Sequence, residues 1–358
     1  MNTTSRKLIL ISLASLTLIA LAACGTIATP EGKATTPSAA TEAVPVVATL
    51  APTSAATTVE TVATEAVPVA ATLAPTSAAT TAAGITLVLG DVSNKPTALI
   101  ATYQPFINYL AAQLSKQGIT AGVVKVAPDF TTIADWLKGG QVDLIFQTPY
   151  PAVLLEDAVG AKTVLRRWKG GDAEYYGVIF ARADTGMKTV ADLKGHMMAV
   201  QDEYSTSSYM LPLSFAADAG LKLTKKDSPD AAVAADEVGY TNSNGDDNTL
   251  QWVISGKVAV GGTDNRTYEK IPEETRKQLV ILAETEKIPR NVMMVRPGMD
   301  PALVEAIKAV LFNMDKTDEG KAILKGFQGT AKFDELPGGP ESALARVRAL
   351  TKLIKKGG

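Results

Sequence analysis

The sequence predicts an α/β protein with two lobes that follows an export leader and a non-globular segment. All 20 aromatic residues (3 Trp, 9 Tyr, 8 Phe) lie after residue 83, so a core is expected only within residues 84–358. In that part, short apolar runs alternate with segments of helical periodicity. The alternation starts again after residue 175, which favours two α/β lobes over one.

Composition excludes several classes of function. The chain has 35 basic and 37 acidic residues, one Cys and one His. Near-neutral charge argues against nucleic-acid binding by bulk charge. A zinc site of the Cys/His type lacks ligands, and a disulfide framework is impossible. A Ser-His-Asp mechanism would have to use His196. No cofactor is expected.

The N-terminus has the pattern of an exported lipoprotein. Two basic residues precede the apolar run 8–22, which ends in Leu21-Ala22-Ala23-Cys24. The run is shorter than the roughly 20 residues of a membrane span, so residues 1–23 are predicted to be a signal peptide. The tetrapeptide resembles the bacterial lipobox, in which Cys24 would be lipidated and anchor the chain to the membrane. An ordinary signal peptide with an incidental Cys, or an uncleaved anchor, is the alternative.

Residues 24–83 are predicted to be a disordered tether. The segment Thr41–Thr58 recurs as Thr64–Thr81 with one difference, Val47 against Ala70. Two copies without aromatic residues cannot enclose a core, and their prolines block helix continuation.

The first lobe is predicted from three strand–helix pairs. The strands are expected at Ile85–Gly90, Gly122–Ala127 and Val142–Phe146, and the helices at Thr97–Leu114, Thr131–Lys138 and Pro149–Val159. This order implies a parallel, doubly wound sheet whose ligand end lies at the strand carboxyl ends.

The rest of the chain continues the alternation. Strands are expected at Tyr175–Arg182, His196–Gln201, Lys257–Gly261, Gln278–Ala283 and Asn291–Val295. Helices are expected at Ser207–Ala219, Asn248–Ser255 and over Pro301–Lys356 with breaks at Gly326–Lys332 and Pro337–Pro340. If Ile179–Ala181 and Met293–Val295 cross between lobes, lobe 1 comprises 84–181 plus 290–358, and lobe 2 comprises 182–289.

The most informative stretch is Asp202–Pro212, which follows a strand and opens a helix. Four hydroxyl residues, Ser205 to Ser208, stand where the first N–H groups of a helix have no intrahelical partner. Together they can form an uncharged anion socket at the positive end of the helix dipole. The alternative is a plain N-cap, which needs one Ser or Thr.

Four segments, in this order along the chain, resemble the phosphonate/phosphite/phosphate-binding proteins of ABC importers. They are FTTIADWLKGGQVDLIFQTPYPAVL (Phe130–Leu154), YYGVIFARADTGMKTVADLKG (Tyr175–Gly195), DLKGHMMAVQDEYSTSSYMLP (Asp192–Pro212) and LQWVISGKVAVGGTDN (Leu250–Asn265). The resemblance covers residues 84–358. It implies a type II periplasmic-binding-protein fold with a ligand cleft between the lobes.

The sequence departs from the family pattern at three places. Ser208 stands where the family has Gly, Thr148-Pro149-Tyr150 replaces Gly-Pro-aromatic, and Asn242-Ser243-Asn244 replaces Gly-Ser-His. These differences leave the fold unchanged and leave the ligand open.

The resemblance implies a set of site residues. Ser205, Thr206 and Ser207 would hold the phosphorus oxygens, and Tyr150 would close over them from the first lobe, unless it is a packing aromatic. Asp264 would accept a P–OH proton and reject sulfate, or it caps a turn.

Three further residues stand near these positions. Ser93, after the first strand, is a further candidate for the cleft. Asp246 and Asp247 either bind a ligand amine or cap a helix.

The resulting prediction is a monomeric, lipid-anchored solute-binding protein on the outer face of the cytoplasmic membrane. It would deliver a small phosphorus oxyanion to ABC permease and ATPase subunits, with no nucleic-acid partner and no metal. The alternatives are a ligand-sensing module for a membrane partner and an extracellular phosphoesterase-like enzyme.

Overall fold

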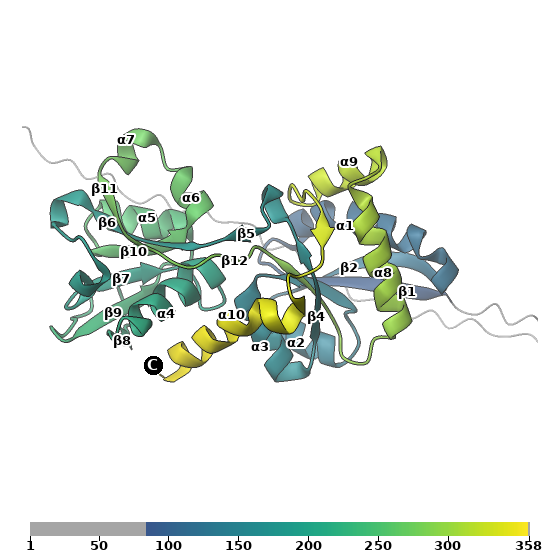
Figure 1. The fold of residues 1–358 in the computed structure, drawn as a ribbon, viewed down its shortest axis with the longest axis horizontal. Helices are drawn as coiled ribbons and strands as arrows, with labels where there is room; N and C mark the ends of the chain where they lie inside the picture. The colour runs from purple at the N-terminus through teal and green to yellow at the C-terminus, as the bar shows by residue number, and fades with distance from the viewer. Residues whose placement is uncertain (1–83, 357–358) are drawn as a thin grey trace, which may run out of the picture. The chain divides into compact units, whose positions relative to one another are not determined.

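A computed structural model describes residues 84–356, which fold around two six-stranded sheets and a two-stranded ribbon (Figure 1). The predicted signal peptide, Cys24 and the tether lie outside the described residues. The α/β class predicted from the sequence is confirmed.

The first sheet has the order β14-β4-β13-β3-β1-β2. Its strands are β1 (Ile85–Val92), β2 (Ile119–Ala127), β3 (Leu144–Gln147), β4 (Lys162–Arg167), β13 (Val292–Val295) and β14 (Phe333–Asp334). Strand β1 pairs parallel with β2 and β3, but β13 pairs antiparallel with both β3 and β4. The expected wholly parallel sheet is therefore mixed, because β13 returns from the second lobe and enters between strands of the first.

The second sheet has the order β11-β6-β10-β7-β9-β8. Its strands are β6 (Gly177–Arg182), β7 (Met197–Val200), β8 (Lys222–Lys225), β9 (Glu237–Asn242), β10 (Val260–Asp264) and β11 (Leu279–Glu284). Strands β4 and β14 of the first sheet and β8 and β9 of the second had no counterpart in the prediction. Strand β10 also lies about three residues later than expected, so that Asp264 ends the strand.

The chain crosses between the lobes at β5 (Glu174–Tyr175) and β12 (Ile288–Pro289), which pair antiparallel (Figure 1). The predicted crossings at Ile179–Ala181 and Met293–Val295 are wrong, because both segments are central strands of a sheet. Lobe 2 therefore begins near residue 176 instead of 182. The return crossing at β12 ends at residue 289.

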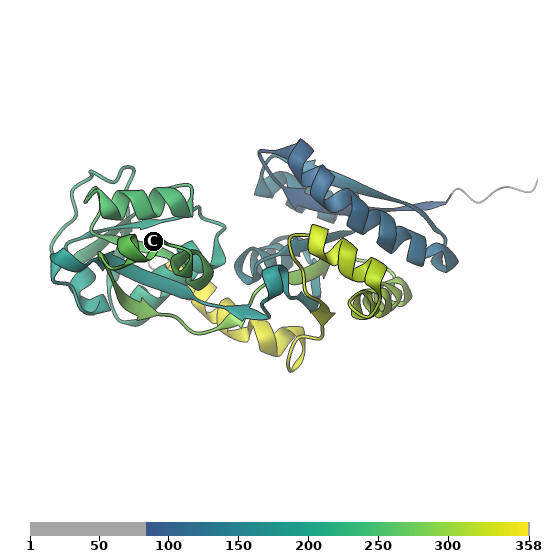
Figure 2. The same cartoon turned by 90° about the horizontal axis from the view of Figure 1, so that it is seen from above.

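Helices cover both faces of each sheet. Lobe 1 carries α1 (Pro96–Gln113), α2 (Phe130–Lys138), α3 (Pro149–Val159), α8 (Pro301–Met314), α9 (Asp318–Gly326) and α10 (Gly339–Lys356). Lobe 2 carries α4 (Leu211–Asp218), α5 (Asp246–Ile254), α6 (Asn265–Glu269) and α7 (Glu273–Arg276). Helix α1 lies along β1 and β2 (Figure 2), and in Figure 1 α4 lies on one face of the second sheet with α5 and α6 on the other.

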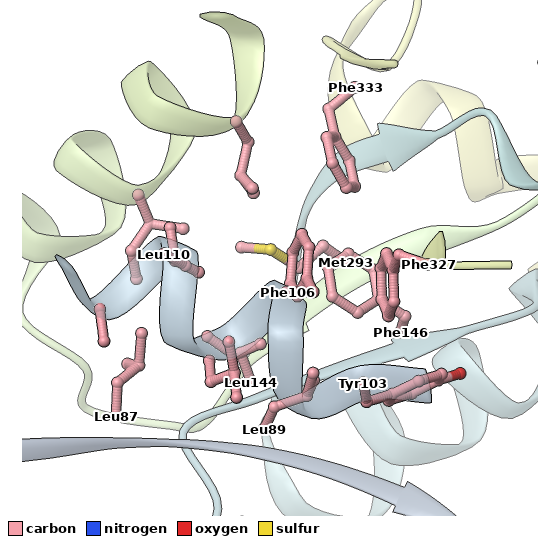
Figure 3. Close-up of a cluster of buried hydrophobic side chains, with 14 of the residues drawn as sticks. Leu87, Leu89, Tyr103, Phe106, Leu110, Leu144, Phe146, Met293, Phe327 and Phe333 are labelled. Carbon is pink, nitrogen blue, oxygen red and sulfur yellow. The ribbon is translucent and has the colours of Figure 1, made fainter. Parts of the chain in front are cut away.

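Aromatic side chains build the main core of lobe 1 (Figure 3). The ring of Phe106 on α1 stacks on Phe327 with centroids 4.0 Å apart, and Phe146 of β3 meets Phe327 edge-on. Met293 of β13 lies in the same buried cluster. Segments more than 200 residues apart in the chain thus share one core, which explains why the C-terminal residues belong to lobe 1.

Helix α10 contacts helices of both lobes. It packs on α3 and on α4, and its Leu344, Val347 and Leu350 are buried in a cluster that also holds Tyr175 and Met210. The expected assignment of residues 290–358 to lobe 1 alone is thus incomplete. Among residues 84–356, no helix is long and apolar enough to span a membrane.

Candidate ligand-binding site

A cavity of about 800 Å³ lies between the two lobes, beside the strands that cross between them. Its first-lobe wall consists of residues that follow β1, β2 and β3, including Asp91, Ser93, Asp129 and Gln147. The carboxyl ends of neighbouring parallel strands meet at one sheet edge, so the topology brings these residues together. Ser93 therefore lines the cavity as expected, and its Oγ accepts the N–H of Lys95 at 2.9 Å.

The second-lobe wall is built around the helix start at Ser205. A π-helical turn, Thr206–Met210, runs into α4, and Ser205 is its N-cap, with Oγ accepting the Ser208 N–H at 3.2 Å. Such π turns recur at functional sites. The N–H groups of Thr206 and Ser207 open the helix, where no preceding turn supplies acceptors. Ser205, Thr206, Ser207 and Ser208 all line the cavity, so the helix start that is predicted to bind an anion faces it.

Thr206 differs from the expectation in what its hydroxyl does. The Oγ1 atom donates to Thr148 Oγ1 at 2.8 Å and accepts the N–H of Tyr150 at 3.0 Å. Both partners belong to lobe 1. The hydroxyl of Thr206 therefore joins the lobes, and only its backbone N–H remains for a ligand.

Tyr150 does not line the cavity. Its ring packs in the buried cluster of α3, α4 and α10 and stacks on Tyr209 with centroids 6.4 Å apart. Burial raises the pKa of its hydroxyl to about 12. The structure therefore matches the packing alternative, and the backbone N–H of Tyr150 is what reaches Thr206.

Three carboxylates of lobe 2 line the cavity: Asp202, Asp246 and Asp264. Asp264 is 9% exposed, and its Oδ1 caps α6 by accepting the N–H groups of Arg266 and Thr267 at 2.9 and 3.1 Å. Asp246 accepts the hydroxyl of Thr263 at 2.8 Å, and burial raises its pKa. Asp247 is exposed and is not part of the cavity wall.

Sequence reasoning missed the cationic part of the wall. Lys169, Tyr175 and Arg290 all line the cavity, and the guanidinium of Arg290 lies 4.4 Å from the ring centroid of Tyr175. The Tyr175 hydroxyl is buried, and it has no hydrogen-bond partner among the described residues, nor has the buried Nε of Arg290. Burial in this surrounding lowers the pKa of Lys169 to about 8, helped by Arg167 and Arg290.

The basic run Arg166–Lys169 is not a solvated face. Instead Arg167 is fully buried, stacks 3.7 Å from the Phe327 ring and donates to Phe327 O at 2.8 Å and Thr330 Oγ1 at 2.9 Å. Nothing in the sequence of Arg166–Lys169 indicates that Arg167 is buried. The sequence also gives no indication that Arg290 lines the cavity, because its position depends on the pairing of β5 with β12.

The remaining surface offers less chemistry. A second hollow of about 590 Å³ lies on lobe 2 alone, beside α5 and Lys270, and no buried unpartnered polar atom lines it. His196 is exposed at the start of β7 and does not line the ligand cavity. Among the described residues, no group of three or more His, Cys, Asp or Glu side chains could hold a metal ion.

Comparisons with known proteins agree with this geometry. XAC2383 from Xanthomonas citri, solved with chloride and with ATP, is 28% and 27% identical, with a TM-score of 0.70 in each case, covering 76% of this chain and 98% of the other. PhnD1 from Prochlorococcus marinus, solved with methylphosphonate, has a TM-score of 0.56 at 16% identity, covering 76% of this chain and 98% of its own. That second likeness shows the fold alone.

The family match spans most of the described residues. Residues 92–336 match the family described as "ABC transporter, phosphonate, periplasmic substrate-binding protein". This range contains both sheets except β1, of which it includes only the last residue, together with both crossing strands and every residue of the cavity wall except Asp91. Its members bind substrates for transport and are not enzymes. The chain, with its two α/β lobes and the cavity between them, therefore belongs to the family of periplasmic substrate-binding proteins of phosphonate ABC transporters.

Proposed function

We propose that the chain binds a small phosphorus oxyanion (a phosphonate, phosphite or phosphate) in the cavity and delivers it to an ABC permease. The observation that carries this proposal is the set of donors without acceptors on one cavity wall. The helix start at Ser205–Ser208 supplies N–H groups and hydroxyls to this wall, and the N–H groups of Thr206 and Ser207 have no intrahelical acceptor. Unpaired buried donors cost free energy unless a ligand accepts from them. XAC2383, whose solved complexes contain chloride and ATP, also supports an anionic ligand.

Asp264 is proposed to distinguish the phosphorus anion from sulfate. Its Oδ2 atom accepts one hydrogen bond, from Thr267 Oγ1 at 3.0 Å, so a lone pair is left for a P–OH proton. Sulfate has no proton to give at neutral pH, and its approach would set two anions side by side. Asp246 belongs to the same wall and would meet an ammonium group if the ligand carries one.

Anchoring through Cys24 and a monomeric state complete the proposal. The anchor would place the binding protein beside its permease on the outer face of the membrane. Loss of acyl labelling in Cys24→Ser is the expected result, and continued labelling would contradict it. The sensing module remains a second use of the same site, since delivery and sensing share one binding step.

The test is isothermal titration calorimetry with phosphate, phosphite, methylphosphonate and sulfate at one pH, after native mass spectrometry has identified any ligand purified with the protein. We expect at least one phosphorus anion to bind and sulfate to bind much more weakly. Ser207→Ala should weaken binding about 10- to 100-fold, because a donor to a charged group contributes about 1.5–3 kcal/mol. Ser214→Ala, a buried Ser on α4 that bonds to Leu211 O, is the matched control.

The variant Asp264→Asn tests the proton acceptor separately. Asn retains an oxygen to cap α6, so the fold should persist. The affinity ratio of phosphorus anion to sulfate should fall, because the Asn amide can donate to either anion. An unchanged ratio would remove Asp264 from the site, and no binding of any phosphorus anion would overturn the proposed function.

A further inference from the structure

Three side chains gather at the hinge end of the cavity. Lys169 lies in the turn after β4, Tyr175 in β5 and Arg290 directly after β12. Because β5 and β12 pair antiparallel, with Tyr175 opposite Ile288, Tyr175 and Arg290 are held on the two strands that connect the lobes. The Arg290 guanidinium covers the Tyr175 ring at 4.4 Å. All three line the same cavity as the helix start at Ser205.

Within the described residues, Lys169, Tyr175 and Arg290 lack the ion-pair or hydrogen-bond partners that basic side chains elsewhere in the protein have. Arg166, Arg266 and Arg296 each form an ion pair, with Asp334, Asp172 and Asp143 at 2.8–2.9 Å. In the part of the chain that the structure describes, the side chains of Lys169 and Arg290 form no ion pair and no hydrogen bond. The Tyr175 hydroxyl is also unpartnered, in a residue that is 2% exposed.

The charges around Lys169 and Arg290 come from several segments. Arg167, Lys169 and Arg290 lie close enough to influence one another, and Asp91, whose own pKa is raised by burial, opposes them. Four further carboxylates line the cavity, and two of them, Asp246 and Asp264, accept hydrogen bonds from Thr263 and from the start of α6. Among the described residues, neither Lys169 nor Arg290 forms an ion pair with any of these carboxylates. Both cations are therefore available to an anionic group in addition to the one that the uncharged helix start can hold.

The cavity is also larger than one oxyanion requires. Its volume, about 800 Å³, falls in the range of sites for drug-sized ligands, about 300–1,000 Å³. The helix start already offers two N–H groups and hydroxyls for the oxygens of one phosphorus group. The donors at the hinge end are left for another part of the ligand.

We propose that Lys169, Tyr175 and Arg290 form a basic subsite beside the helix start, and that the ligand presents a second anionic group to it. The inference rests on the proposed function, since it takes the phosphorus group at Ser205–Ser208 as the first anionic group. The second is a carboxylate or another phosphoryl group on the same molecule. Both have planar or clustered oxygens that a guanidinium and an ammonium can bind together.

The test compares ligands with one and two anionic groups by calorimetry at fixed pH and ionic strength. The probes are methylphosphonate, phosphonoacetate, pyrophosphate and malonate. We expect phosphonoacetate or pyrophosphate to bind at least tenfold more tightly than methylphosphonate. Preference for phosphonoacetate would identify the second group as a carboxylate, and preference for pyrophosphate would identify it as a phosphoryl group.

Variants test whether the tighter binding of ligands with two anionic groups depends on the basic subsite. In Lys169→Gln the advantage should largely disappear, while the affinity for methylphosphonate changes less than threefold. Lys162→Gln, exposed at the other end of β4, is the matched control and should behave as wild type. Tyr175→Phe removes only the hydroxyl and should reduce the advantage in part. It provides a second test if Arg290→Gln does not fold.

The outcomes separate the two proposals. If methylphosphonate binds as tightly as the ligands with two anionic groups, the subsite is overturned and the proposed function stands. If Lys169→Gln weakens methylphosphonate as much as phosphonoacetate, the cations serve the phosphorus group itself, which also overturns the subsite. Binding of malonate without any phosphorus ligand would overturn the proposed function and support the basic subsite.

Discussion

At the scale of single residues, Lys169 shows how position changes the chemistry of an ordinary side chain. Burial, together with the charges of Arg167, Arg290 and Arg266, lowers its pKa to about 8, while Asp91 opposes this shift. These four groups come from β4, the segment after β12, α6 and β1. The free protein therefore holds Lys169 charged at neutral pH and loses this charge in mildly alkaline solution.

This pKa predicts that anion binding depends on pH. A bound anion favours the charged ammonium and so raises the pKa of Lys169. The complex then binds more protons than the free protein above pH 8, and the affinity should fall with rising pH, by up to tenfold per pH unit. Titrations from pH 7 to 9.5 in buffers of different ionisation enthalpy should detect the proton uptake. Lys169→Arg keeps the positive charge throughout this pH range and should abolish the fall in affinity. If the affinity of this variant still falls equally with pH, the titrating group belongs to the ligand and not to Lys169.

At the scale of elements, one contact joins the turn after β4 to α6. Arg266 donates to Lys169 O and Gly170 O at 3.1 Å each and pairs with Asp172 at 2.9 Å. Its approach depends on Gly170, which has φ of +66° and where a Cβ would collide with the Arg266 guanidinium. Because Asp264 caps α6 and Lys169 lies in the turn, this contact links two walls of the cavity.

Gly170→Ala should therefore lower the free energy of unfolding by about 1–2 kcal/mol from backbone strain, with an added cost from the collision. Gly171→Ala is the matched control, since Gly171 also has positive φ (+94°) but has nothing within 4 Å of its Cβ position. In an Arg266→Ala background the cost of Gly170→Ala should decrease by about 0.5 kcal/mol or more. Equal costs in both backgrounds, measured by urea denaturation, would contradict the contact.

At the scale of the whole described fold, α10 packs against both lobes and is expected to couple their unfolding. Its apolar residues recur at helical spacing (Leu344, Val347, Leu350) and are all buried. They share a cluster with Met210 and Leu211 of lobe 2 and with Tyr175 and Ile288 of the crossing strands. Arg346 adds contacts to Glu286 and Asp218.

Leu344→Ala should lower the free energy of unfolding by about 2–5 kcal/mol, because it leaves a cavity in this shared cluster. Calorimetric unfolding should still show one transition, shifted to lower temperature, if the cluster couples both lobes. Lys352→Ala, exposed on the same helix, should leave the transition within about 0.5 kcal/mol of wild type. Two separated transitions in wild type would show that α10 does not couple the lobes.

Local signals made much of this architecture predictable. The apolar runs identified β1, β3, β6, β7 and β13, and the hydroxyl-rich helix start at Ser205–Ser208 lines the cavity. Ser93 and Asp264 were found for the same reason, because residues that follow strand ends gather at one sheet edge. The missed strands β8 and β9 are short or carry polar residues, and their pairing depends on neighbours distant in sequence.

The sequence by itself determined the fold class, the helix start and the resemblance to phosphorus-anion binding proteins, because periodicity and N-terminal helix chemistry are local properties. Only the tertiary structure decided where the chain crosses between lobes, that Thr206 joins them and that the Tyr150 ring packs away from the cavity. It alone also brought Lys169, Tyr175 and Arg290 together. These residues come from three segments separated by up to 121 positions (290 − 169). The physical reason is that the surroundings of a buried charged group are created by the pairing of distant strands. Composition and local sequence patterns do not record that pairing.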